Sequence, residues 1–284
     1  DESPAIQLID EEQADQTDEK GKFNIYSFPH GAGAGTMLHE LLEQVDLSSV
    51  QQEATENIIY EKLLSFGYDP AWQPAIVEML ENLSNVSLHN DIPGLTLSSI
   101  PPGNCLHELE FYFPISRISP ESLRAIFNQN ITKSTSAIPG SLIEQQLDRL
   151  TFSPARGFMK GFIDLVFTYQ GKFYLVDWKS NYLGPDVKNY SNDRLIDSVY
   201  SGFYFLQYHL YCLALHLYLK NRLPGYSYET HFGGVFYIFL RGVKKELGPE
   251  HGIFFDRPAT SMVENFAQAL VPGYNRHDLK TTCT

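Results

Sequence analysis

The chain has 284 residues, of which 43% are hydrophobic and 19% charged, values typical of a globular protein with a sizeable core. Its net charge of −13 argues against a strong non-specific grip on nucleic acid, which requires many Lys and Arg side chains. No apolar run approaches the roughly 18 residues that span a bilayer, and the acidic start is unlike a signal peptide, so we expect a cytoplasmic protein with no membrane partner. The spacing of the cysteines argues against a disulfide framework, a structural zinc or a four-cysteine iron–sulfur cluster; they are Cys105, Cys212 and Cys283.

The negative charge is concentrated at the start of the chain. Residues 1–20 hold eight acids and one base, a charge of −7, whereas the remaining 264 residues carry −6 from 26 acids and 20 bases. Because this segment is polar and lacks apolar periodicity, we predict a disordered acidic linker or tail over residues 1–22. Residues 23–284 are then the folded domain.

The first half of the domain is predicted to be mostly helical. A glycine-rich loop over residues 28–36 precedes a helix that we expect to start at Thr36, with His39 in its first turn. The loop has neither the GxGxxG nor the Gly-Lys-Ser/Thr spacing of a nucleotide-binding loop. Residues 51–90 are predicted to be helical with a break at 67–74, and the alternating run 108–115 is predicted to be a strand.

The second half predicts a hairpin, two helices and a further strand. After a mixed, loop-rich stretch over 116–155, two strands over 157–179 are joined by a tight turn at Gln170-Gly171. A long helix over 194–221, a buried strand over 233–240 and a closing helix over 259–270 follow. The order helix, three strands, helix, strand indicates an α/β layered domain built on a mixed sheet.

The hairpin carries the strongest candidate site. With Gln170 and Gly171 at the turn centre, facing residues have numbers that sum to 341, which makes Asp164 and Asp177 a directly opposed pair with Cβ atoms roughly 5 Å apart. Lys179 lies two residues beyond Asp177 and shares its face. Like charges placed opposite each other destabilise a sheet, so we predict a bound divalent cation with Lys179 beside it.

The chemistry of these three side chains suits phosphate-ester cleavage. Mg²⁺ prefers carboxylate oxygens, waters and phosphate; it polarises a phosphate and makes a bound water nucleophilic. Lys179 can orient that water or stabilise charge that develops on the phosphate. The alternative is a pair of surface aspartates that form salt bridges to a lysine, and spacing alone does not decide between the two. The apolar neighbours Phe162, Val166 and Leu175 favour the metal site, because we expect them to half-bury the carboxylates.

Other polar residues are candidates with structural alternatives. The imidazole of His39 can complete a metal site or serve the fold alone. Gln207 and Tyr211, at i and i+4, share a helix face and can address a phosphate or a base, or belong to an aromatic core face. Glu108 and Glu110 share one strand face, and either can point to the site.

Several separate stretches of the chain resemble the C-terminal nuclease domain of RecB, the beta subunit of the bacterial RecBCD helicase–nuclease (exodeoxyribonuclease V). The resemblance extends over residues 28 to 258 and is weakest at 46–105 and 116–155. Four motifs occur in the same order in both, namely 161–167 (GFIDLVF), 174–184 (YLVDWKSNYLG), 204–216 (YFLQYHLYCLALH) and 231–243 (HFGGVFYIFLRGV). The segments 35–39 and 108–112 also match.

The resemblance implies the PD-(D/E)xK nuclease superfamily, with a restriction-endonuclease-like three-layer fold in which helices flank a central mixed sheet. It also implies Mg²⁺-dependent cleavage of DNA, mainly of single strands, both exo- and endonucleolytic. By motif match, the metal ligands are His39, Asp164, Asp177 and the backbone carbonyl of Trp178. Lys179 is then the catalytic lysine. The supporting positions are the QxxxY pair Gln207 and Tyr211 and one of Glu108 and Glu110.

The resemblance also implies partners. The chain looks like the nuclease part of a RecB subunit, so the expected partners are the helicase part of RecB, the RecC and RecD subunits, and a single-stranded DNA end that the helicase supplies. RecA recombinase is a further expected partner. Two other interpretations remain open, namely a non-catalytic docking module for RecA or other RecBCD subunits, and a structural domain whose carboxylates pair with basic side chains.

Overall fold

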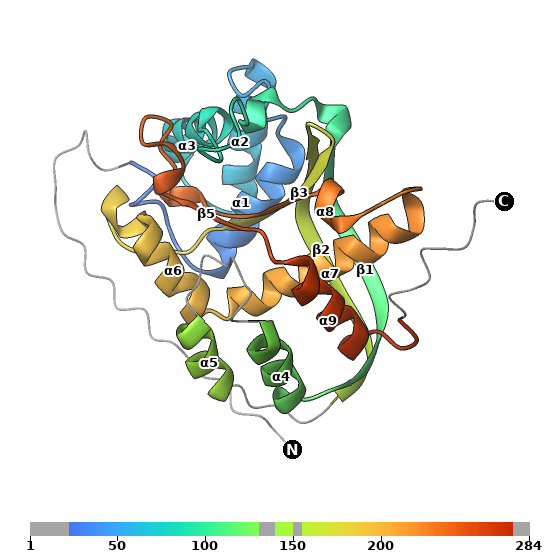
Figure 1. Ribbon diagram of the computed structural model, residues 1–284. Coiled ribbons are helices and arrows are strands. Elements are labelled where there is room, and N and C mark those ends of the chain that lie inside the picture. The colour runs from blue at the N-terminus through green and yellow to red at the C-terminus, as the bar shows by residue number, and fades with distance from the viewer. Residues whose placement is uncertain (1–22, 131–139, 150–154, 275–284) are drawn as a thin grey trace.

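A computed structural model describes residues 23–130, 140–149 and 155–274, so the acidic segment predicted over 1–22 lies outside it. A five-stranded mixed sheet lies between two layers of helices (Figure 1). This confirms the predicted α/β fold with a central mixed sheet flanked by helices. The strands, in their spatial order, are β1 (Cys105–Ile118), β2 (Ala155–Tyr169), β3 (Lys172–Lys179), β4 (Phe232–Phe239) and β5 (Ile253–Asp256).

Helices cover both faces of the sheet. One face carries α1 (Ala32–Gln44), α2 (Glu53–Ser65) and α3 (Gln73–Asn85). The other face carries α4 (Pro120–Asn130), α5 (Gly140–Asp148), α6 (Asn192–Ser201), α7 (Tyr204–Arg222) and α9 (Thr260–Leu270). The short α8 (Tyr228–His231) precedes β4. Single 3-10 turns occur at Pro70–Trp72, Leu97–Ser99, Pro102–Asn104, Val187–Tyr190, Leu240–Gly242 and Gly248–Glu250.

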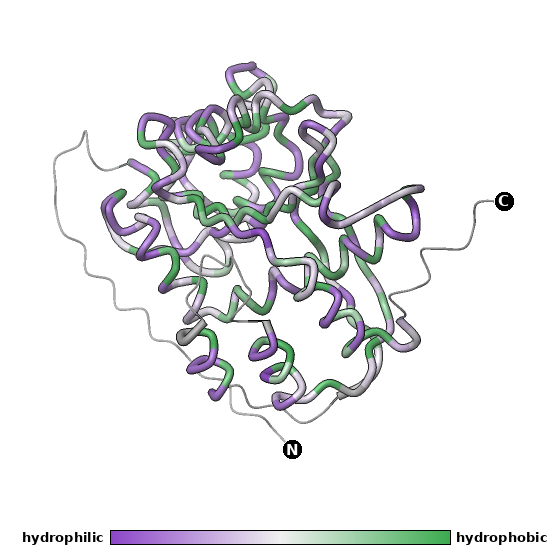
Figure 2. Tube along the Cα trace, viewed as in Figure 1, coloured by the Kyte–Doolittle hydropathy of each residue, from purple (hydrophilic) through white to green (hydrophobic). Residues whose placement is uncertain are grey.

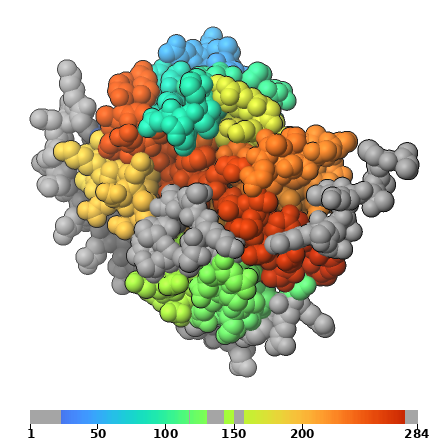
Figure 3. Space-filling model, viewed as in Figure 1, coloured from blue at the N-terminus to red at the C-terminus, as the bar shows by residue number. Residues whose placement is uncertain are grey.

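Alternation along the central strands divides the core in two. On β3, Leu175 packs into the core beneath α7, whereas Val176 and Trp178 pack into the core beneath α1–α3. Successive side chains of a strand point to opposite faces, and a strand covered on both faces is hydrophobic throughout. The strands and the inward faces of the helices are accordingly hydrophobic in Figure 2, and Figure 3 shows α4 and α9 side by side on the outer surface.

The hairpin turn and its register follow the sequence closely. Gln170 and Gly171 have φ of 49° and 75°, the left-handed pair of a type I′ turn. Leu165 pairs with Val176, as the predicted sum of 341 requires. The β2–β3 ladder ends at this pair, one position before Asp164 and Asp177.

Three predicted elements differ from the structure. The long helix predicted over 194–221 is two helices, because Phe203 has a left-handed φ of 56° between α6 and α7. The first helix begins at Ala32, inside the glycine-rich loop, so His39 lies two turns in. The stretch 116–155 is not mainly loop, since it contains α4 and α5, and the sequence reading missed the short edge strand β5.

Hydrogen bonds from a buried arginine connect the segment before α1 to the end of β3. The guanidinium of Arg241 is fully buried and donates hydrogen bonds of 2.7–3.2 Å to four backbone carbonyls. Three of these precede α1 and the fourth follows β3; they belong to Ile25, Phe28, Pro29 and Ser180. A Cβ at Gly35 of α1 would lie 2.9 Å from the Ser180 hydroxyl, so a glycine there lets α1 approach the end of β3.

No helix in the described part of the chain is long and apolar enough to cross a membrane.

We predict that Arg241→Met lowers the free energy of unfolding by about 3 kcal/mol or more, because several buried carbonyls lose a charged donor. Urea denaturation measures the change. Arg222→Met, at the exposed end of α7, is the matched control and should change stability by less than about 0.5 kcal/mol. Equal effects of the two substitutions would contradict the role of Arg241.

Two buried histidines should make the stability of the fold sensitive to acid. Burial lowers the pKa of both His209 and His216 from 6.5 to about 4. The unfolded chain therefore binds these protons first, and stability falls as the pH drops from about 6.5 to about 4, by up to about 1.4 kcal/mol per pH unit for each histidine. In His209→Gln, the free energy of unfolding should depend less steeply on pH over this interval. An unchanged slope would contradict the prediction.

Candidate functional site

Asp177 and Lys179 form a buried ion pair near the end of β3. Asp177 is 4% exposed, and its Oδ2 lies 2.6 Å from Lys179 Nζ, so the two side chains share a face as predicted. Burial raises the pKa of the Asp177 carboxyl to about 6; the Lys179 ammonium opposes this shift and the charge of Asp164 adds to it. The anionic form of Asp177 therefore depends on nearby positive charge.

Helix α7 places an amide against this ion pair. Gln207 Oε1 accepts hydrogen bonds from Lys179 Nζ at 3.0 Å and from the Tyr237 hydroxyl at 2.8 Å. Gln207 Nε2 donates to the Tyr211 hydroxyl at 2.8 Å and to Asp177 Oδ1 at 3.4 Å. The i, i+4 pair Gln207 and Tyr211 thus contacts the hairpin residues, and one amide fixes both charged groups.

Two tyrosine rings complete the surroundings of the lysine. Lys179 Nζ lies 3.9 Å from the centre of the Tyr204 ring and 4.6 Å from that of Tyr237, distances at which the ring faces attract an ammonium. The sequence reading missed both tyrosines. Tyr237 is opposite Asp177 in the parallel β3–β4 ladder, a register that no local pattern specifies.

Asp164 lies where β2 and β3 separate. Its Oδ2 accepts the Trp178 backbone N–H at 2.7 Å, so a side chain replaces the next ladder hydrogen bond. The same oxygen is 3.6 Å from His39 Nδ1 of α1. The contact with Asp164 raises the pKa of His39 against the opposing effect of burial. Three elements thus bring His39, Asp164 and Asp177 into one region.

Of the two candidate glutamates, Glu108 is the one beside this region. It lies on β1 between His107 and Leu109, which pair with Leu165 and Ile163 on either side of Asp164, and it has a left-handed φ of 50°. Burial raises the pKa of Glu108, and the charges of Glu43 and Asp164 raise it further. Glu110 instead forms an exposed ion pair with Lys160 at 2.7 Å. The sequence reading missed Glu43, although its i+4 spacing from His39 on α1 was a usable signal.

Glu108 also marks a reversal of the sheet faces. Before Asp164, Ile163 belongs to the core beneath α7; directly after it, Leu165 belongs to the core beneath α1–α3. Two residues of one strand normally face the same way, so the strand is irregular at Asp164. The irregularity brings Asp164 and Glu108 to the boundary of the two cores.

The donors here have the chemistry of a hard-cation site. Two carboxylates and an imidazole lie in one region, and Asp177 Oδ2 is buried with the Lys179 ammonium, 2.6 Å away, as its charged neighbour. Such an oxygen is suited to a cation. Across residues 23–130, 140–149 and 155–274, however, no three His, Cys, Asp or Glu side chains are close enough to hold a metal ion as they stand. The residues therefore fit a metal by type rather than by their spacing in this structure.

The flanking apolar residues only partly meet expectation. Val166 and Leu175 are buried beside the carboxylates, whereas Phe162 is 43% exposed. The carboxylates are nonetheless buried as expected, since the side chains of Asp164 and Asp177 are 14% and 6% exposed.

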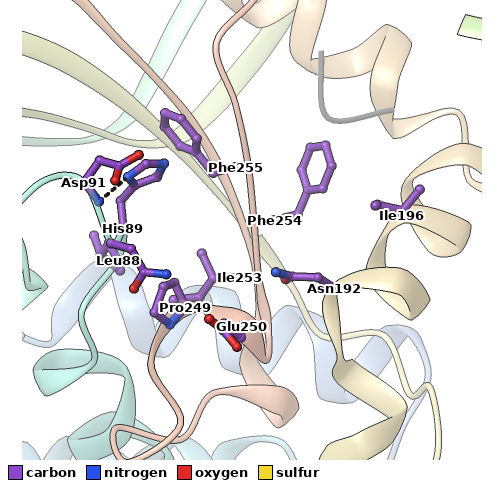
Figure 4. Close-up of a pocket in the computed structure, with 11 residues that line it drawn as sticks. Leu88, His89, Asp91, Asn192, Ile196, Pro249, Glu250, Ile253, Phe254 and Phe255 are labelled. Atoms are coloured by element: carbon purple, nitrogen blue, oxygen red, sulfur yellow. Dashed lines mark hydrogen bonds between the residues drawn. The ribbon is translucent and has the colours of Figure 1, made fainter. Parts of the chain in front are cut away.

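A separate cavity of about 430 Å³ lies away from this cluster, between β5, α6 and the loop that contains His89 and Asp91 (Figure 4). None of the cluster residues lines it.

The fold and the site together define an α/β protein with a buried lysine–carboxylate pair at the end of a central strand. Comparison with known proteins then identifies the family. The chain is homologous to RecB, a RecBCD enzyme subunit. It is 39% identical to RecB of Escherichia coli over 239 residues (84% of this chain) and 36% identical to RecB of Haemophilus influenzae over 242 residues (84%). RecB of Mycolicibacterium smegmatis is 31% identical over 240 residues (76%). No family model matches.

The chain spans about a fifth of the length of these relatives, namely 19%, 18% and 21%. The homology supports a role related to that of the RecBCD enzyme. It confirms the resemblance on which the sequence interpretation rested. The roles of individual site residues stay predictions.

We predict that Gln207→Ala lowers the free energy of unfolding by about 1–3 kcal/mol, because Lys179 and Tyr237 each lose a partly buried partner. Gln51→Ala, which removes one exposed hydrogen bond to Glu81, is the control and should change stability by less than about 0.5 kcal/mol. Urea denaturation of both variants measures the difference. Equal stability of the two variants would show that the amide does not hold the pair together.

Proposed function

We propose that this chain is a metal-dependent deoxyribonuclease that hydrolyses phosphodiester bonds, mainly in single-stranded DNA. The observation that carries the proposal is the buried Asp177–Lys179 pair, fixed by Gln207 and adjoined by Asp164 and His39. A buried ion pair costs more in desolvation than it commonly returns in stability. Its presence beside a second carboxylate is therefore better explained by catalysis than by folding.

Mg²⁺ would be held by His39, Asp164, Asp177 and the backbone carbonyl of Trp178. When bound, it would polarise the scissile phosphate and lower the pKa of a water. Asp177 Oδ2 is buried beside Lys179 Nζ, and His39 Nδ1 lies 3.6 Å from Asp164 Oδ2. Holding the ion would require these groups to move closer together than they lie in the described residues.

Lys179 would have a catalytic role at the phosphate rather than a structural role in the fold. Its ammonium is held at Nζ by Asp177, Gln207 and two ring faces. A cation fixed in this way stabilises negative charge that develops on a phosphate oxygen without having to reorganise, and it can also orient the attacking water. Tyr211, on the same α7 face as Gln207, would hold the amide in place.

We further propose that the chain acts within a RecBCD-type helicase–nuclease for DNA repair and recombination. Residues 23–284 would be the nuclease domain and 1–22 an acidic linker. A helicase, with RecC and RecD subunits, would supply the single-stranded end, and RecA would be a further partner. The RecB relatives support this context. The charge of −13 agrees with it, because a nuclease that is fed by a motor needs little DNA affinity of its own.

The test is cleavage of labelled single-stranded DNA by the purified chain with Mg²⁺. We expect EDTA to abolish cleavage, Asp177→Asn to remove it, and Lys179→Met to slow it about 100-fold or more, the effect typical of losing one charge-stabilising group. Lys245→Met, an exposed lysine whose partner is the neighbouring Glu246, is the control and should leave the rate unchanged.

Cleavage that survives EDTA, or equal rates for wild type, Asp177→Asn and Lys179→Met, would overturn the proposal. Absence of any cleavage by a folded chain would favour the docking-module interpretation instead.

A further inference from the structure

An exposed aromatic strip leads toward the candidate site along β1 and β2. We use this name for Tyr112 on β1 together with Phe158, Lys160 and Phe162 on β2. Tyr112 and Phe158 are each 61% exposed and Phe162 is 43% exposed. The rings of Tyr112 and Phe158 lie parallel, with centroids 4.6 Å apart and an angle of 8° between planes.

The strip lies on the part of the sheet that only two strands form. Residues 155–163 of β2 pair with β1 alone, because the β2–β3 ladder begins at Leu165, and this ribbon runs on past the rest of the sheet (Figure 1). Its other face packs into the core: a Cβ at Gly161 would lie 2.5 Å from the Phe111 ring. The strip therefore occupies the face that α7 and α9 do not cover.

The face of the strip continues directly to the site. Phe158, Lys160, Phe162 and Asp164 are alternate residues of β2, with one residue between each and the next. Alternate residues of a strand share a face, and the reversal of faces comes only after Asp164. At a rise of about 3.3 Å per residue, Phe162 lies about 7 Å along the strand from Asp164 and Phe158 about 20 Å. On β1, Tyr112 leads in the same way to Glu108.

The exposed rings of Tyr112, Phe158 and Phe162 lie on the strands that lead to the proposed phosphate-cleaving site. Such rings can serve as a platform on which nucleic-acid bases stack. Every base has a flat π-face, so stacking on aromatic side chains holds a single strand without regard to sequence. Lys160 adds a cation: it pairs with Glu110 at 2.7 Å and lies 5.4 Å from the Phe162 ring centre. Both ends of that ion pair are exposed, so it is weak and the ammonium is available to a phosphate.

Bases suit this face better than another protein does. From Glu110 to Pro114 of β1 and their partners on β2, this face carries Glu110, Tyr112, Pro114, Phe158, Lys160 and Phe162, so two charged side chains lie among its three rings. Phe158 and Phe162 lie on the same strand as Asp164, so the rings follow the direction of the site. A track is thus more consistent with the arrangement than a docking surface.

We infer that the aromatic strip binds single-stranded DNA, stacking bases on Tyr112, Phe158 and Phe162 and contacting a phosphate through Lys160, and so guides the strand to Asp164. This rests on the proposed nuclease function for its direction, but binding itself needs neither metal nor cleavage. The aromatic strip would also provide local affinity for DNA, which the net negative charge of the chain does not provide.

The experiment measures the affinity of the 284-residue chain for a short labelled oligothymidylate in EDTA by fluorescence anisotropy. Loss of stacking costs about 1–3 kcal/mol per base, so the double substitution Tyr112→Ala with Phe158→Ala should weaken binding at least about tenfold. Tyr60→Ala on α2, an equally simple loss of an aromatic ring that is 45% exposed, is the matched control and should bind as wild type does.

Two further measurements separate stacking from general damage. An abasic strand of the same length offers phosphates but no bases, so its weaker binding should be insensitive to the double substitution and sensitive to Lys160→Ala. Phe158→Trp should keep the affinity and add a tryptophan fluorescence signal that oligothymidylate quenches.

Unchanged affinity of the double variant, absence of quenching in Phe158→Trp, or no binding by the wild-type chain would each overturn the strip as a DNA track; a variant that binds DNA normally but loses self-association would assign the rings to a protein contact. Failure of the nuclease proposal looks different: DNA binding in EDTA would then still depend on the rings, while no cleavage appears with Mg²⁺.

Discussion

The arrangement of the site depends on the buried guanidinium of Arg241. It satisfies carbonyls that precede α1 and the carbonyl of Ser180 that follows β3, so two segments more than 150 residues apart in the sequence have one fixed relation. Unpaired buried carbonyls are costly, which makes this relation hard to relax. Because α1 carries His39 and β3 carries Asp177, the same contact determines whether the two can serve one centre.

The polar groups buried in the site lower the stability of the fold. Asp177 and Lys179 are buried where hydrophobic residues would be more favourable, and Gln207, Tyr211 and Tyr237 are used to satisfy them. The network removes freedom from the lysine before any substrate arrives. Under the proposed function, that preorganisation would make a fixed charge effective against a developing one.

The elements that the sequence predicted well are those whose signal is local. The turn at Gln170-Gly171 requires left-handed backbone, which Gly adopts freely, and the turn then determines the register of every pair in the hairpin. The long helix over 194–221 was wrong because its apolar pattern continues across the break, and only the left-handed backbone at Phe203 ends it. The edge strand β5 has four residues, too few for alternation to identify.

The sequence by itself determined the hairpin, and with it the shared face of Asp177 and Lys179, because strand alternation and turn chemistry act between near neighbours. It also indicated Gln207 and Tyr211 as one helix face. Tertiary structure alone decided that Tyr237 completes the lysine's surroundings, that Glu108 rather than Glu110 adjoins Asp164, and that Phe162 is exposed. Those outcomes depend on parallel pairing, on a strand irregularity and on which faces the helices leave uncovered, which are all contacts between residues distant in the chain.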